Sequence, residues 1–110
     1  MNRIVLAGLL FLAPAPALAA TWSGVPLVDR KCEPTVEKNP DAHTTACLLQ
    51  CAGSGYGILS DGKFIHLDRA GNEMAVSALK ATHQKDHVRV NVTGERKGEV
   101  IHVRSLTLST

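Results

Sequence analysis

The strongest structural signal in the chain is an alternating pattern near its C-terminus. Val88, Val90 and Val92 alternate with polar residues, and the apolar pattern resumes at 100–103 after the glycines at positions 94 and 98. Period-two alternation on both sides of a glycine-bounded segment is typical of two antiparallel strands that bury one face. The pattern therefore predicts a hairpin with its turn at 94–98 and a fold built on a β-sheet.

The apolar parity changes after Val103. Leu106 and Leu108 fall on the opposite parity to Ile101 and Val103. Because successive side chains of a strand point to opposite faces, one extra residue is needed to return both leucines to the same face. The sequence predicts a β-bulge at Arg104 or Ser105.

Other segments complete the predicted order of elements. A first strand is expected over 21–31, with Pro26 at an edge or a bulge, and a second hairpin over 56–68 around the turn Asp61-Gly62. An amphipathic helix is expected over 73–84, with Asn72 as its N-cap. The expected core residues follow from these periodicities: Ile65, Leu67, Val88, Val90, Val92, Ile101 and Val103, with Met74 and Leu79 covering one end.

The segment between the first strand and the hairpin is rich in polar residues and proline. Residues 32–41 read as an irregular loop. A short helical turn is expected to follow, capped by Asp41 or Thr44, extending to Cys51 and stopped by the glycines at 53 and 55. This segment is an insert that carries all the cysteines of the chain.

The first twenty residues have the pattern of a secretory signal peptide. Arg3 precedes an apolar run over 4–12, and small residues surround the expected cleavage site near Ala20. The run is much shorter than the ~20 residues that span a bilayer. We therefore expect residues 1–20 to be removed, with residues 21–110 forming one domain without a membrane span, periplasmic or secreted from a bacterial cell.

Charge and length exclude several classes of function. The chain has 12 basic and 10 acidic residues, and removal of Arg3 leaves 11 against 10, a net charge of +1. A charge this small, with few aromatic residues, predicts no nucleic-acid binding. A mature domain of this size is too small for most cofactor-binding enzymes, and the sequence lacks nucleophile-elbow and zinc-protease motifs. We expect a protein that is not an enzyme and needs no cofactor.

The order strand, insert, hairpin, helix, hairpin is the order of an OB-type barrel. Further features are Trp22-Ser23-Gly24, Cys32 followed by Cys47-x-x-x-Cys51, the turn Ser60-Asp61-Gly62-Lys63, and the closing strands over 90–106. With these features the chain resembles a family of small secreted bacterial OB-like proteins of unknown function. The resemblance implies a mostly β fold, an OB-like barrel of five strands, with one short helix between strands 3 and 4 and the cysteine-bearing insert after strand 1.

Cys32, His43, Cys47 and Cys51 are the residues most able to carry chemistry. On a helical turn the last three recur every four positions along one face. One interpretation is a structural disulfide from Cys32 to Cys47 or Cys51, which would close a loop worth about 3 kcal/mol. A second is a Cys3His site for zinc or copper, and a third is a redox-active pair of thiols.

Three functional hypotheses follow from the sequence. The first is an exported, non-enzymatic OB-like module that binds a small ligand or a protein partner in the cell envelope. The alternatives are a metal-binding protein that uses the Cys3His cluster with zinc or copper, and a thiol-redox protein in which Cys47 and Cys51 exchange with a partner.

Overall fold

The computed structural model describes residues 19–36 and 38–109, of which 35 and 36 by their backbone alone. The predicted signal peptide lies outside the described residues up to position 18. None of the described helices is both long and apolar enough to span a membrane.

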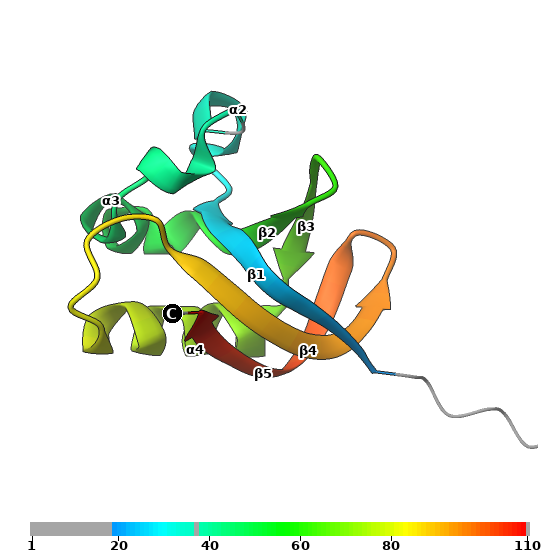
Figure 1. Ribbon diagram of the computed structural model, residues 1–110. Coiled ribbons are helices and arrows are strands. Elements are labelled where there is room, and N and C mark those ends of the chain that lie inside the picture. Colours follow the sequence, from blue (N-terminus) through cyan, green and yellow to red (C-terminus); the bar gives the residue numbers. More distant parts are fainter. Residues whose placement is uncertain (1–18, 37, 110) are drawn as a thin grey trace, which may run out of the picture.

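Within the described residues, five strands form one sheet: β1 (Ala20–Asp29), β2 (Tyr56–Ser60), β3 (Lys63–Leu67), β4 (Arg89–Lys97) and β5 (Val100–Ser109). Their order in the sheet is β1-β2-β3-β5-β4, and β4 also pairs with β1, which closes the sheet into a barrel (Figure 1). All neighbours are antiparallel except β3 and β5, which run parallel. The prediction of a mostly β domain with five strands is confirmed.

The β2–β3 hairpin turns where the sequence predicts. Asp61 and Gly62 have φ angles of 51° and 76°. Positive φ at both central residues is the requirement of the tight turn that matches the twist of a hairpin, and aspartate followed by glycine is the pair that meets it at least cost. Ser60 pairs with Lys63 across the turn.

The β4–β5 hairpin differs from its prediction in the position of the turn. Its β4 strand continues through Gly94 to Lys97, so the predicted turn at 94–98 is wrong. Gly94 belongs to the strand because β5 approaches it closely, and a Cβ atom there would collide with the carbonyl oxygen of His102.

The predicted bulge in β5 is confirmed. Thr93 pairs with Ser105 and Gly94 pairs with Val103, which leaves Arg104 as the extra residue.

Helix α4 (Arg69–Ala81) lies between β3 and β4, as predicted, but it begins four residues earlier than position 73. Its N-cap is Asp68, whose Oδ1 accepts the backbone N–H groups of Gly71 at 3.0 Å and Val103 at 3.2 Å. Asn72, the predicted cap, accepts the N–H of Tyr56 at 2.7 Å instead. Glycine is required at position 71, inside the helix, because a Cβ atom there would collide with the side chain of Val103.

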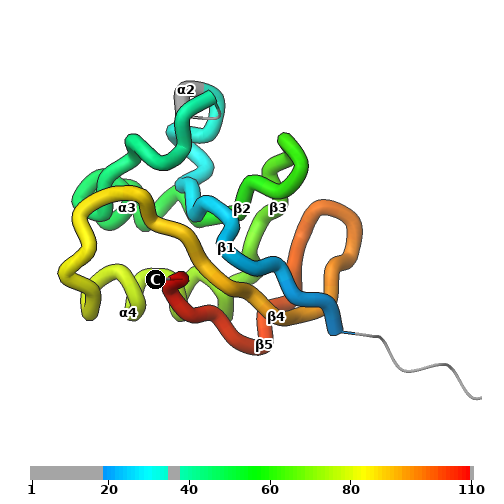
Figure 2. Tube along the Cα trace, viewed as in Figure 1, coloured from blue at the N-terminus to red at the C-terminus, as the bar shows by residue number. Residues whose placement is uncertain are grey.

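The insert between β1 and β2 forms short helices. Helix α2 (Glu33–Val36) and the 3-10 turn η1 (Pro40–Ala42) occupy the segment predicted to be an irregular loop, so that prediction is wrong. Helix α3 (Thr45–Gln50) and the 3-10 turn η2 (Ala52–Ser54) follow. Figure 2 shows these elements at the opposite end of the barrel from the β4–β5 turn.

The barrel interior holds the residues that the alternation predicts. All seven expected core residues are buried, Leu79 is buried with them, and Met74 packs partly buried against the cluster. Leu27, Leu48, Tyr56 and Ile58 extend this core toward the insert. Burial of Leu48 is what attaches α3 to the barrel, because an exposed leucine at this position would forgo about 1.5–3 kcal/mol.

Candidate functional site

Asp29 is a buried acid at the last position of β1. Its side chain is 0% exposed, and in the sheet it lies opposite Tyr56. Its Oδ1 accepts the backbone N–H of Cys32 at 2.8 Å, and its Oδ2 accepts a hydrogen bond from Nε2 of His43 at 2.6 Å. Removing a carboxylate from water costs several kcal/mol unless it is paired. Loss of either hydrogen bond would therefore be unfavourable, and the two bonds fix the positions of Cys32 and His43 next to Asp29.

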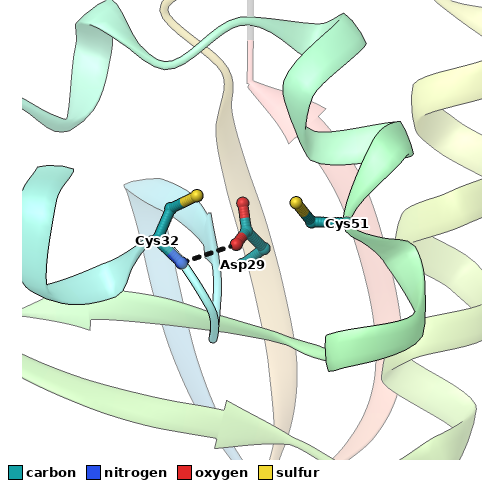
Figure 3. A group of neighbouring side chains, drawn as sticks. All are labelled: Asp29, Cys32 and Cys51. Atoms are coloured by element: carbon teal, nitrogen blue, oxygen red, sulfur yellow. Dashed lines mark hydrogen bonds between the residues drawn. The ribbon is translucent and has the colours of Figure 1, made fainter.

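Two thiols flank the carboxylate of Asp29. Cys32 lies in the turn after β1, Cys51 is the C-cap of α3, and both are partly buried. Figure 3 shows the two sulfur atoms on opposite sides of the carboxylate, each turned toward it. The sulfur atoms and one carboxylate oxygen all lie within 4.8 Å of one another. No disulfide bond joins any two of the three cysteines.

Local structure fixes the position of Cys51. Thr44 caps α3 by accepting the N–H of Cys47 on its hydroxyl at 3.1 Å. At the other end of the helix, the backbone N–H of Cys51 donates to the carbonyl of Cys47 at 3.1 Å. The buried hydroxyl of Tyr56 donates to the carbonyl of Leu48 at 2.7 Å, which ties α3 to β2. Cys51 is therefore held against the barrel rather than on a free loop.

Burial and the charge of Asp29 raise the pKa values of two neighbouring side chains. Burial raises the pKa of Cys32 to about 11, and the hydrogen bond and negative charge of Asp29 add to the rise. Burial likewise raises the pKa of Tyr56 to about 12, again with a contribution from the charge of Asp29. Near neutral pH the Cys32 thiol keeps its proton, so a thiolate there needs a cation close by.

The structure brings together only part of the predicted cluster. Cys32 and Cys51 lie in the group, whereas His43 reaches it through Asp29. Cys47 is exposed and lies outside the group. The four-residue spacing does not bring Cys47 into the group, because Cys47 is exposed on α3 whereas Cys51, the C-cap, is partly buried next to Asp29.

Sequence reasoning missed Asp29. The available signal was an acid that directly follows the apolar residues at 25–28 and precedes Cys32 by three positions. Aspartate side chains often accept a backbone N–H two or three residues onward, and this contact orients the acid and the thiol together.

An ion pair attaches the insert to β4 beside this site. Arg89 donates from Nε to Oδ1 of Asp41 at 3.0 Å and from Nη2 to Oδ2 at 2.8 Å, and its Nη1 donates to the carbonyl of Gly24 at 2.8 Å. These hydrogen bonds hold the pKa of Asp41 below its usual range. Because both side chains are partly exposed, the contribution is about 0.5–1 kcal/mol.

We expect Asp41→Asn to lower the free energy of unfolding by about this amount at pH 7. Since the pKa of Asp41 is lower in the folded state, the stabilisation is complete above the unfolded pKa of about 3.9 and disappears as pH falls through the folded value. Urea unfolding at pH 7 and near pH 2.5 should show the difference from wild type shrinking. Glu73→Gln, which removes only an exposed contact with Arg69, is the control. A difference that stays constant with pH would contradict the assignment.

Comparison of the chain with protein-family models, curated proteins and solved structures finds no match. Asp29, Cys32 and Cys51 together form the thiol–carboxylate site.

Proposed function

We propose that this protein is an exported, non-enzymatic OB-like module that binds one zinc ion at the thiol–carboxylate site. The observation that carries the proposal is that two sulfur atoms and a carboxylate oxygen lie within 4.8 Å of one another in a partly buried place. Ligand atoms around tetrahedral zinc are about 3.3–3.8 Å apart, given the usual zinc–sulfur and zinc–oxygen bond lengths. Small side-chain rotations would close this gap.

Two features support the OB-like fold and the export of the protein. The strand order β1-β2-β3-β5-β4, with α4 between β3 and β4, is the order of the five-stranded OB barrel. The leader pattern over 1–20 favours export, so the expected location is the periplasm or the cell exterior.

The donor atoms favour zinc over copper. Cu(I) prefers soft sulfur ligands, whereas zinc accepts thiolate and carboxylate together. The proposed set differs from the Cys3His set expected from the sequence, because Asp29 takes the place of Cys47. His43 acts as a positioning residue that orients the carboxylate of Asp29 through the 2.6 Å hydrogen bond.

Charge gives a second argument. Asp29 is fully buried beside two thiols. Among the described residues, His43 is the only basic side chain that forms a hydrogen bond with its carboxylate. A bound dication would compensate the buried charge and stabilise both thiolates. Three protein ligands leave a fourth coordination position, which water can fill.

Zinc content tests the proposal. Reduced protein is mixed with zinc, dialysed and analysed for metal, with Cys47→Ser as the matched control because its thiol lies outside the site. We expect one zinc per chain in wild type and in Cys47→Ser, and loss of the metal in Cys51→Ser. Wild-type protein that retains no zinc, or Cys51→Ser that retains as much as wild type, would refute the proposal.

A further inference from the structure

The two thiols of the proposed zinc site are also placed to react with each other. Cys32 follows the end of β1 and Cys51 ends α3, and their sulfur atoms lie within 4.8 Å. Figure 3 shows both side chains extending into the same space from different segments of the chain. A disulfide needs the sulfur atoms about 2.05 Å apart, so bond formation requires both side chains to rotate toward each other past the carboxylate of Asp29.

We propose that Cys32 and Cys51 form a disulfide by exchange with an external disulfide, and that this bond and the zinc ion exclude each other. The inference rests on the proposed zinc function for its second half only. An oxidising compartment outside the cytoplasm supplies disulfides of this kind, as small molecules or on oxidoreductases.

The exchange proceeds in two balanced steps. One protein thiolate attacks a sulfur atom of the external disulfide, which forms a mixed disulfide and releases one external thiolate. The second protein thiolate then attacks the protein sulfur of the mixed disulfide, and the second external thiolate leaves. The two protons of the protein thiols pass to the released thiolates. The protein loses two hydrogens, and the external disulfide is reduced to two thiols.

The disulfide and the zinc ion exclude each other because both need the electron pairs of the same two thiolates. Zinc requires two thiolates, and the disulfide has none to offer. Conversely, thiolates that share an electron pair with zinc are weaker nucleophiles toward an external disulfide. Zinc should therefore protect Cys32 and Cys51 from oxidation, and oxidation should release zinc.

The fold tolerates both states. Either state replaces the hydrogen bond between the Cys32 thiol and Asp29, but the contacts of Asp29 with His43 and with the backbone N–H of Cys32 involve neither sulfur atom. The position of α3 depends on Thr44, Leu48 and Tyr56. These contacts are compatible with the bond and with the ion, so switching between the states requires no unfolding.

The test uses the chain with Cys47→Ser, which leaves Cys32 and Cys51 as its only thiols. Reduced protein is exposed to oxidised glutathione with and without one equivalent of zinc, alkylated with N-ethylmaleimide and weighed intact, while bound zinc is measured on the same sample. Without zinc we expect loss of two hydrogens and no alkylation. With zinc we expect oxidation at least about tenfold slower, restored by a chelator.

Two alkylated thiols, or two glutathione adducts, after long exposure without zinc would overturn the disulfide. An unchanged oxidation rate in protein that holds one zinc per chain would overturn the exclusion. Loss of two hydrogens in protein that binds no zinc would support the disulfide and refute the proposed zinc function. Cys47→Ser combined with Cys51→Ser, which leaves one thiol, should give only a mixed disulfide.

Discussion

Asp29→Asn is expected to weaken zinc binding by at least about 100-fold without destabilising the metal-free protein. Asparagine fills the same volume and keeps an oxygen for the backbone N–H of Cys32, and its amide can donate to the other tautomer of His43. The substitution therefore preserves both hydrogen bonds while removing a buried charge, which costs free energy in the absence of a cation. The same change should lower affinity and leave stability equal or higher.

Thermal unfolding with and without zinc separates these two effects. In wild type, zinc at 100 times its dissociation constant should add about 2.7 kcal/mol, which corresponds to about 10–20 °C in Tm for a domain of this size. In Asp29→Asn the Tm without zinc should equal or exceed that of wild type, and the same zinc concentration should add at most about 0.4 kcal/mol, which is RT ln 2 for a 100-fold loss of affinity. A variant that gains as much from zinc as wild type would show that Asp29 is not a ligand.

Val90→Asp is expected to prevent folding. Val90 is 0% exposed in β4, where it lies between Val25 of β1 and Leu108 of β5. A carboxylate at this position would face the apolar barrel interior with no partner, at a cost of several kcal/mol. This cost is comparable to the whole stability of a small domain, about 5–15 kcal/mol.

Asn91→Asp is the matched control for Val90→Asp. It introduces the same charge one residue away, on the outer face of β4, and it keeps the oxygen that accepts the N–H of Gly24. Circular dichroism and urea unfolding should show a folded, cooperative Asn91→Asp and an unfolded Val90→Asp. A Val90→Asp variant with the unfolding midpoint of wild type would contradict the register of β4.

The β-sheet could be predicted because a strand that buries one face has apolar and polar residues in alternation. Val88, Val90 and Val92 show the buried face directly, and the change of parity before Leu106 predicts the bulge that the structure has at Arg104. Asp61-Gly62 predicts its turn because the backbone conformation there depends on the two residues themselves. These are local constraints, and local constraints are visible in a sequence.

The errors arise where contacts between distant segments decide the structure. Gly94 resembles a turn residue but lies inside β4, where the close approach of His102 leaves no space for a Cβ atom. Gly71 stands before the predicted start of the helix at position 73 but lies in the first turn of α4, where Val103 packs against it. Glycine alone does not reveal whether it serves a turn or a tight contact.

The site was predictable by residue type and not by arrangement. Cys32 and Cys51 stand out as thiols, but only the path of the chain after β1 brings them together around Asp29. Asp29 was missed because its one local signal, an acid three positions before Cys32, is common in turns and does not by itself indicate burial. Its partner His43 lies fourteen residues away in the sequence, where no periodicity connects the two.

The most direct measurement of the central claim is the absorption spectrum of the reduced wild-type protein with one equivalent of Co²⁺, which occupies zinc sites and reports its ligands. Two thiolates and a carboxylate in a four-coordinate site predict intense visible bands and a near-ultraviolet thiolate-to-cobalt band with the strength of two sulfur ligands. Stoichiometric zinc should abolish both. A spectrum of hexaaqua cobalt, without the thiolate band, would contradict the claim that Asp29, Cys32 and Cys51 form a metal site.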